Sequence, residues 1–227
     1  MTAVVVQSRL GSTRLPGKAL LPLGGATLTD QVLRRLGQVS VDGLVLATDE
    51  ESAPELGPIA ARNGFELLVG PAEDVLGRYC LAIRRYGIDL VLRATGDNPL
   101  VSAELAALLL ERRAGAAARG RAPDYAAFVG MPLGMGVELV SARALLKAEA
   151  EASLKPEREH VCPYLYDHPE IFAIDRSEAP PAYLISGARI TVDTRSDYEA
   201  MLRVYGSLYD GKPVRDEALL DYLRAAV

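Results

Sequence analysis

The stretch that decides the fold is the junction between an apolar run, Ala3-Val4-Val5-Val6, and residues 8–20, Ser-Arg-Leu-Gly-Ser-Thr-Arg-Leu-Pro-Gly-Lys-Ala-Leu. A continuous β-branched run is typical of a parallel strand that is buried on both faces. In open α/β sheets, ligands bind in the crevice where such strands end. The junction therefore predicts an α/β protein with a ligand-binding loop directly after its first strand.

The composition of this loop indicates which ligand it binds. Gly11 and Gly17 permit close backbone approach and positive φ, and the loop also carries Arg9, Arg14 and Lys18. Arginine offers a bidentate fork and lysine a point charge to phosphate oxygens, so three cations in ten residues favour a polyphosphate. The loop matches neither the Walker A pattern nor Gly-x-Gly-x-x-Gly, and these two nucleotide folds are disfavoured.

Length, charge and cysteine content narrow the class of protein. With 227 residues, 49% of them hydrophobic, the chain is long enough for one large α/β domain. A net charge of −5 argues against bulk nucleic-acid binding, so the basic loop is expected to take a small anion. The absence of a long apolar stretch and of a signal-peptide pattern predicts no membrane partner and a cytoplasmic location. Cys80 and Cys162 lack Cys-x-x-Cys spacing and are expected to be buried thiols.

Short apolar runs alternate with helical patterns through the first hundred residues. This alternation predicts a parallel sheet covered on both faces by helices. The expected strands are residues 3–7, 43–48, 65–69 and 88–93, and the expected helices between them are residues 29–38, 51–63 and 74–86.

The regular alternation of strand and helix patterns ends in the second half of the chain. A helix over 101–118, capped by Ser102, leads into an Arg/Gly/Ala/Pro-rich loop that ends near residue 123. Beyond it we expect strands at 137–140, 171–174 and 188–192, and helices at 142–152, 156–161, 196–209 and 216–226.

Two aspartates are expected to face the basic loop. Asp97, in Arg93-Ala94-Thr95-Gly96-Asp97-Asn98-Pro99-Leu100, follows a buried strand, and Ser102 already serves as the cap of the next helix. Asp193 follows an apolar segment directly before a helix, where a capping role is the alternative. Mg²⁺ in nucleotide sites usually takes one or two carboxylates together with phosphates and water. The pair therefore predicts a magnesium site that bridges nucleotide phosphates.

At this point the residues resemble a known family. Residues 7–18, with Pro22-Leu23-Gly24-Gly25, resemble the signature of sugar-acid cytidylyltransferases, most closely the spore coat polysaccharide biosynthesis protein F branch, which is related to CMP-KDO and CMP-acylneuraminate synthetases. Further blocks of that branch follow in order over nearly the whole length: Glu73–Tyr79, Arg93–Leu100, Gly136–Leu139, Glu157–Val161 and Thr191–Thr194.

The resemblance implies a Rossmannoid, glycosyltransferase-A-like nucleotidyltransferase fold, α/β, with a mostly parallel sheet. It implies a single domain over residues 1–227, in which 123–175 form an acceptor and dimerisation subdomain, and hence a homodimer. The implied reaction transfers CMP from CTP to an acidic sugar or similar alcohol, releases pyrophosphate and serves surface polysaccharide or glycan synthesis. A nonulosonic acid, another acidic sugar, a phosphonate and a polyol phosphate remain open as acceptors.

The functional residues of the family can be assigned to the positions of this sequence that match its motifs. The resemblance implies Lys18, Arg14 and Asp97 as catalytic residues, with Asp97 and Asp193 as Mg²⁺ ligands. Nucleotide binding is implied for Arg9, Gly11, Ser12, Arg14, Lys18 and Asp97, and acceptor binding for Arg93, Glu138, Arg158 and His160.

Some positions have a second interpretation or depart from the family. The run that contains Arg158, Glu159 and His160 could instead be a solvated helix face. Arg78 and Asp74 fit an ordinary i, i+4 helix pair. Three residues depart from the family pattern and leave the base or acceptor preference open: Ser8 for Ala, Asn98 for Cys and Val69 for Arg.

Two other functions are compatible with the fold. One is a glycosyltransferase that uses a nucleotide sugar, and the other is a non-catalytic nucleotide-binding module. Glycosyltransferases of this fold usually depend on an Asp-x-Asp element, which the sequence lacks, and a binding module would have no reason to keep both Asp97 and Asp193.

Overall fold

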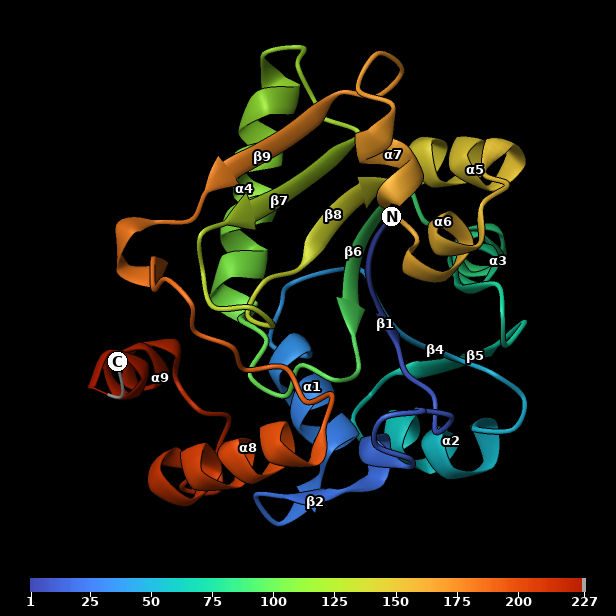
Figure 1. The fold of residues 1–227 in the computed structure, drawn as a ribbon. Helices are drawn as coiled ribbons and strands as arrows, with labels where there is room; N and C mark the ends of the chain where they lie inside the picture. The colour runs from blue at the N-terminus through green and yellow to red at the C-terminus, as the bar shows by residue number, and fades with distance from the viewer. Residues whose placement is uncertain (226–227) are drawn as a thin grey trace.

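Strand β1 (Thr2–Gln7) lies inside a seven-stranded sheet in the computed structural model, which describes residues 1–225 (Figure 1). Successive side chains of a strand point to opposite faces of its sheet. Val4 and Val6 accordingly join one buried cluster and Ala3 and Val5 join the other. The apolar run is therefore buried on both faces, as the sequence predicts.

The sheet has the order β5-β4-β1-β6-β8-β7-β9. The ladders β5–β4, β4–β1, β1–β6 and β7–β9 are parallel, and β8 runs antiparallel to both of its neighbours. The prediction of an α/β fold with a mostly parallel sheet is confirmed. The other strands are β2 (Pro22–Leu23), β3 (Ala26–Thr27), β4 (Gly43–Thr48), β5 (Glu66–Val69), β6 (Leu90–Thr95), β7 (Tyr125–Val129), β8 (Glu138–Ser141) and β9 (Ile174–Glu178), of which β2 and β3 form a separate hairpin.

Helices cover both faces of the sheet. The first face carries α1 (Leu28–Leu36), α2 (Ala53–Arg62), α4 (Ala103–Ala118), α8 (Arg195–Leu208) and α9 (Asp216–Ala225). The second face carries α3 (Val75–Tyr86), α5 (Ala142–Glu151), α6 (Lys155–His160) and α7 (Pro163–Asp167). Two short 3-10 turns complete the secondary structure, η1 (Lys18–Leu20) and η2 (Pro181–Tyr183).

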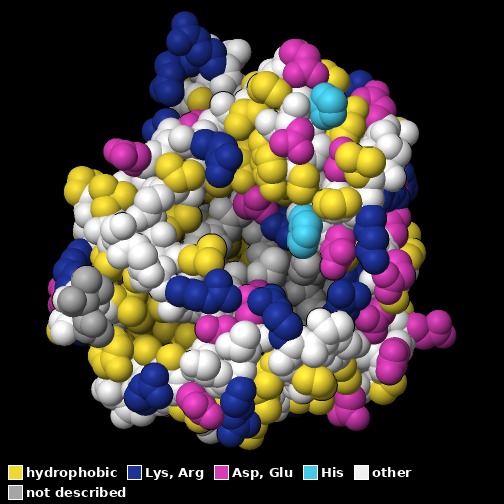
Figure 2. All heavy atoms as spheres, viewed as in Figure 1, with side chains coloured by type: hydrophobic (Ala, Val, Ile, Leu, Met, Phe, Trp, Pro, Cys, Tyr) yellow, Lys and Arg dark blue, Asp and Glu magenta, His cyan; other side chains and the backbone are white. Residues whose placement is uncertain are grey.

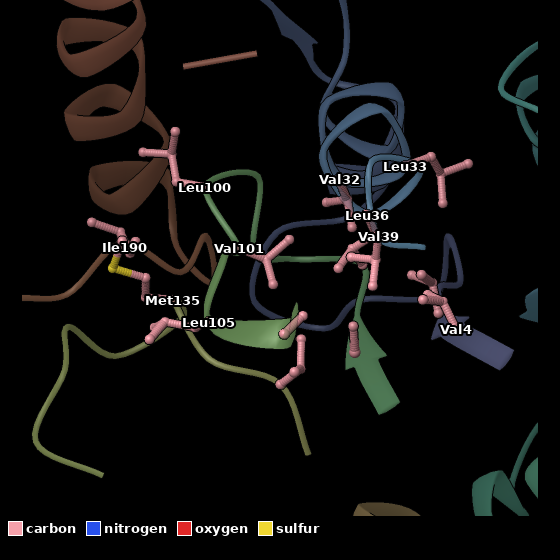
Figure 3. Close-up of a cluster of buried hydrophobic side chains, with 14 of the residues drawn as sticks. Val4, Val32, Leu33, Leu36, Val39, Leu100, Val101, Leu105, Met135 and Ile190 are labelled. Carbon is pink, nitrogen blue, oxygen red and sulfur yellow. The ribbon is translucent and has the colours of Figure 1, made fainter. Parts of the chain in front are cut away.

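The core on the first face joins parts of the chain that are far apart in sequence. Figure 3 shows Leu105 of α4 near Met135 and Ile190, which come from two later loops. These three side chains are at most 2% exposed. Each buried side chain of this size stabilises the fold by about 1.5–3 kcal/mol relative to an exposed one. Their contact fixes the later loops against the end of the sheet that carries the site.

The second half of the chain differs from the sequence expectations in several places. Residues 188–192 form no strand: one isolated bridge pairs Arg189 with Leu133. Ile190 and Val192 are buried, so the sequence has the apolar pattern of a strand although no strand forms. The expected strand at 171–174 begins only at Ile174. The sequence analysis did not predict β2, β3, β7 or α7.

Residues 123–175 supply β7 and β8 to the main sheet rather than a sheet of their own. Their role in acceptor binding and dimerisation stays a prediction. The helix expected at 216–226 corresponds to α9, and residue 226 lies outside the described residues. Among residues 1–225, no helix has the length and apolar character needed to cross a membrane.

A buried ion pair anchors the C-terminal helix. Arg35 of α1 pairs with Asp216 of α9, and these residues are 3% and 2% exposed. The Arg35 guanidinium also donates to the carbonyl oxygens of Val101 and Val214. Asp216 in addition accepts from the hydroxyl of Ser102, the N-cap of α4. One carboxylate thus holds α1, α4 and α9 together.

Replacement of this carboxylate should strongly destabilise the fold. Asp216→Asn leaves the Arg35 guanidinium buried without its counter-charge, which typically costs about 3–5 kcal/mol. Urea denaturation followed by circular dichroism measures the free energy of unfolding. Asp221→Asn is the matched control, because Asp221 lies on the same helix and is 71% exposed in its pair with Arg224. Equal stabilities of the two variants would contradict the assigned anchor.

Candidate active site

The site lies where the strand order reverses. From β1 the chain proceeds outward to β4 and β5, and then crosses back to place β6 on the other side of β1. The loops after β1 and β6 leave the same edge of the sheet from neighbouring strands, and both line one crevice there. Gly96 keeps the bases of the two loops close: its N–H donates to the Gln7 carbonyl at 2.7 Å. A Cβ at Gly96 would lie 2.6 Å from Ser8, so a larger residue would force the loops apart.

The basic loop is organised around Leu10. The Leu10 carbonyl accepts from the backbone N–H groups of Ser12 at 2.8 Å and of Gly17 at 3.1 Å. Gly17 has a φ of 67°, a left-handed conformation that favours glycine. Gly11 does not have positive φ, so of these two glycines Gly17 is the one that adopts the left-handed conformation. A Cβ at Gly11 would meet no protein atom within 4 Å, so this part of the loop is open toward the crevice.

The crevice holds a cavity of about 590 Å³ that is rich in charge. Figure 2 shows the hollow near the centre of one face, bordered by basic and acidic side chains and a histidine. The lining includes six basic and four acidic side chains: Arg9, Arg14, Lys18, Arg78, Arg93 and Lys155, with Glu73, Asp97, Glu159 and Asp193. Because the whole chain carries a net charge of −5, this local excess of cations favours an anionic ligand.

Lys18 bridges the two aspartates. Its ammonium Nζ lies 3.1 Å from Oδ2 of Asp97 and 3.0 Å from Oδ1 of Asp193, and it donates to the Val192 carbonyl at 2.8 Å. The Lys18 side chain is 15% exposed. Asp193 reaches this position because the N–H of Val192 donates to the Asp97 carbonyl at 2.8 Å. The two carboxylates therefore converge on the position of a single cation.

Several cations hold the Asp193 carboxyl in its charged form. Burial opposes its ionisation, but the bond to Lys18, the bond to Arg189 and the charge of Arg14 more than offset this and lower the pKa of Asp193. Arg14 Nη2 lies 3.0 Å from Asp193 Oδ1, and the Arg14 side chain is 63% exposed. Arg14 can therefore turn toward a ligand with little loss of packing.

Two of the predicted acceptor residues form a pair on adjacent strands. Arg93 of β6 lies opposite Glu138 of β8 and forms an ion pair with it. Burial disfavours the charged guanidinium, but the Glu138 charge prevails and raises the pKa of Arg93. Glu138 also accepts from the Tyr125 hydroxyl at 2.7 Å. Arg93 lines the cavity, and Glu138 is not among the lining residues.

Of the other two residues predicted to bind the acceptor substrate, one lines the cavity and the other does not. His160, at the end of α6, lines the cavity, whereas Arg158 does not. Arg158 Nε donates to Asp74 at 3.0 Å, and Nη1 donates to the Glu149 carbonyl at 2.7 Å. The Arg158 guanidinium attaches α6 to the start of α3, and its role in acceptor binding stays a prediction. The alternative i, i+4 pair between Asp74 and Arg78 is wrong, because Asp74 pairs with Arg158.

Sequence reasoning missed Arg78 as a residue of the site. Arg78 is 1% exposed and lines the cavity. Its Nη1 donates to the carbonyls of Pro71 at 2.7 Å and Ala72 at 3.1 Å. The signal was present in the sequence, because Arg78 falls three residues after Val75 and four before Ala82, on the buried face of the helix.

The two cysteines are free and buried, as expected. Burial, followed by the charge of Glu138, raises the pKa of the Cys162 thiol well above its usual range. Within the described residues, no group of three or more His, Cys, Asp or Glu side chains is arranged to hold a metal ion. Among the described residues, Asp97 and Asp193 therefore have no third side chain of these types arranged with them to hold a metal.

Comparisons with known proteins agree with this geometry. A sequence profile described as cytidylyltransferase matches residues 3–211. The chain is 34% identical over 208 residues to the spore coat polysaccharide biosynthesis protein SpsF of Bacillus subtilis, covering 88% of this chain and 85% of that protein.

Solved structures give the same result for the fold. A cytidylyltransferase from Leptospira borgpetersenii superposes with a TM-score of 0.90 at 28% identity, over 99% of this chain and 94% of that chain. A CMP-2-keto-3-deoxy-manno-octonic acid synthetase in complex with CTP superposes with a TM-score of 0.67 at 18% identity, over 91% and 98% of the two chains. The prediction of a nucleotidyltransferase is confirmed, and the chain belongs to the cytidylyltransferase family.

Proposed function

We propose that this protein transfers CMP from CTP to a hydroxyl group of an acidic sugar or similar alcohol and releases pyrophosphate, with Mg²⁺ as the metal. The observation that carries the proposal is the convergence of Lys18, Asp97 and Asp193 at the crevice between the loops after β1 and β6. The name of the Bacillus subtilis relative supports a role in surface polysaccharide synthesis.

The basic loop supplies the triphosphate site in this proposal. Arg9, Ser12 and Arg14 line the cavity on the loop after β1, where they can donate to phosphate oxygens. Nucleotidyl transfer depends mainly on positioning and on neutralisation of charge at the leaving group. Arg14 and Lys18 stabilise the departing pyrophosphate, while the acceptor hydroxyl attacks the α-phosphate in line.

The residues present fit a divalent metal. A single cationic atom, Nζ of Lys18, already lies within 3.1 Å of carboxylate oxygens of both Asp97 and Asp193. Mg²⁺ in such a position supplies charge neutralisation and orientation of the phosphates. Asp97 and Asp193 would hold the metal, and the Lys18 ammonium, released from these two carboxylates, would be available to the triphosphate.

The proposal places the acceptor beside Arg93, Lys155 and His160, which line the cavity. Arg93 is already compensated by Glu138, so its guanidinium serves to position rather than to add net charge. Lys155 and His160 come from the two ends of α6, and Arg158 holds this helix in place through Asp74. An acidic acceptor gains attraction from Lys155 and a hydrogen-bond partner in His160.

CTP with Mg²⁺ should stabilise the protein more than ATP, GTP or UTP. A ligand at about 100 times its dissociation constant adds about 2.7 kcal/mol to the free energy of unfolding. For a domain of this size that corresponds to a rise in Tm of about 5–10 °C. Differential scanning fluorimetry of the four nucleotides, with and without Mg²⁺, measures the shift. A larger shift with any other nucleotide would refute the assignment of CTP.

Removal of either aspartate charge should abolish most activity without unfolding the protein. Asp97→Asn and Asp193→Asn keep the side-chain shape and remove one metal-binding charge each, so pyrophosphate release should fall by about 100-fold or more. The matched control is Asp221→Asn, because Asp221 is 71% exposed on α9 and does not line the cavity. It loses the same charge away from the site, so this control should stay within about three-fold of the parent. Full activity of Asp97→Asn would exclude the metal site.

We also propose a homodimer. Leu133 and Leu184 are 58% and 40% exposed, and a Cβ at Gly130 would lie 2.8 Å from Leu184, so the exposed leucines lie in loops that meet beside β7. Sedimentation equilibrium at micromolar concentration should give about twice the chain mass of 24.3 kDa. Leu133→Asp should shift the protein toward the monomer. A monomeric parent protein would contradict the proposal.

A further inference from the structure

Asp97 directs only one of its carboxylate oxygens at a cation. Its Oδ2 lies 3.1 Å from Nζ of Lys18, whereas its Oδ1 accepts from the Thr95 hydroxyl at 2.6 Å. Asp193, by contrast, uses both of its oxygens for cations, Lys18 and Arg189. A neutral hydroxyl therefore divides the Asp97 carboxylate into an oxygen that faces the cation position and an oxygen that the protein holds.

The direction of the Thr95 hydroxyl is fixed by Asn98. Nδ2 of Asn98 donates to Oγ1 of Thr95 at 2.8 Å. A hydroxyl has a single proton to donate, and an amide N–H can only donate, so the Thr95 proton is left for Asp97. If the amide were turned round, its oxygen would take this proton, and Asp97 Oδ1 would face a lone pair. The three side chains therefore form a chain of hydrogen bonds in one direction, from Asn98 through Thr95 to Asp97, which we call the Thr95–Asn98 relay.

The backbone and the packing hold the relay in place. Thr95 is the last residue of β6 and pairs with Gln7 of β1 in the parallel ladder. A Cβ at Gly134 would lie 2.9 Å from Oδ1 of Asn98, so the loop before β8 packs closely on this amide. The relay thus extends the rigid end of the sheet to the side chain of Asp97.

We propose that Thr95 and Asn98 are positioning residues that present a single oxygen of Asp97 to the divalent metal and thereby favour Mg²⁺ over Ca²⁺. Mg²⁺ demands near-ideal octahedral geometry with short bonds. Ca²⁺ accepts more oxygens in a flexible arrangement and binds carboxylates through one oxygen or both. A carboxylate that is held in one orientation therefore suits the smaller ion. The inference rests on the proposed function and adds to it the origin of the metal preference.

The test measures the affinity of the protein for CTP with each metal. Isothermal titration calorimetry in excess Mg²⁺, in excess Ca²⁺ and in EDTA gives the Kd of Mg·CTP, of Ca·CTP and of metal-free CTP. Thr95→Val keeps the side-chain shape without the hydroxyl, so Mg·CTP should bind about ten-fold more weakly, with the other two within about two-fold of the parent. Asn98→Leu frees the hydroxyl to turn and should weaken Mg·CTP by about five-fold. Thr95→Ser keeps the hydroxyl and should match the parent.

Thr48→Val is the matched control. Thr48 ends β4 as Thr95 ends β6, it is fully buried, and its hydroxyl has no hydrogen-bond partner among residues 1–225. The same substitution at this position should leave all three Kd values within about two-fold of the parent. A double-mutant cycle provides the second control. Thr95→Val should cause no further loss of Mg·CTP affinity in the Asp97→Asn protein, because the relay acts through Asp97.

The outcomes separate a positioning role from other roles. Equal losses for Mg·CTP and metal-free CTP would overturn the proposal in favour of a direct contact between Thr95 and the nucleotide. Additive losses in the double variant would overturn it, since Thr95 would then act without Asp97. So would an unchanged preference for Mg·CTP over Ca·CTP in folded Thr95→Val. Differential scanning fluorimetry checks folding, and if Thr95→Val does not fold, Asn98→Leu decides by the same criterion. A parent protein that binds CTP no better with Mg²⁺ than in EDTA would refute the proposed function itself.

Discussion

The parallel pairing of β1 with a strand on each side is the constraint on which the rest of the structure depends. β4 and β6 can both flank β1 only if the chain reverses its direction of travel across the sheet, and this reversal opens the crevice. The residues of β1 are buried on both faces, so its register cannot slip by one residue without exposing apolar side chains. The loop at residues 8–18 is thereby fixed over the carboxyl end of β6.

The charges of the site are balanced internally in two different ways. Lys18 is shared between Asp97 and Asp193, a group of three charges that can be rearranged when other ions arrive. Arg93 and Glu138 form a closed pair on adjacent strands, with the Tyr125 hydroxyl as a further partner. The first group can exchange partners with ligands, since Asp97 and Asp193 lie in loops and Lys18 is the first residue of the short turn η1. The second is fixed by the ladder between β6 and β8 and provides a rigid wall.

The sequence predicts the parts of the fold in which local pattern and tertiary role coincide. The first four strands of the main sheet and the helices that connect them follow from alternating apolar patterns, and so does the placement of the basic loop beside Asp97. β9 was predicted too early, at 171–174, because the strand itself is a polar edge strand, Ile-Asp-Arg-Ser-Glu, that pairs on one side alone. Residues 188–192 were predicted as a strand because buried apolar side chains in a loop give the same sequence pattern as those of a paired strand.

Side-chain partners in the site were harder to predict than the backbone. Asp74 has Arg78 at helical spacing, yet it pairs with Arg158 from a different helix, 84 positions later in the chain. Helical spacing predicts which side chains can meet on one helix. It gives no information about a residue of α6 that competes for the same carboxylate. Asp193 reaches the site through a bond between the Val192 N–H and the Asp97 carbonyl, which no local pattern reveals.

The two buried arginines, Arg35 and Arg78, differ in whether the protein supplies a counter-charge. Arg35 has a carboxylate partner, Asp216, and four further polar contacts converge on that pair, so the protein alone satisfies it. Arg78 is as deeply buried but has two backbone carbonyls in place of a carboxylate. A carbonyl carries a dipole and no net charge, so it compensates a guanidinium less completely than a carboxylate does. The fold tolerates this deficit at the wall of the cavity, which Arg78 lines.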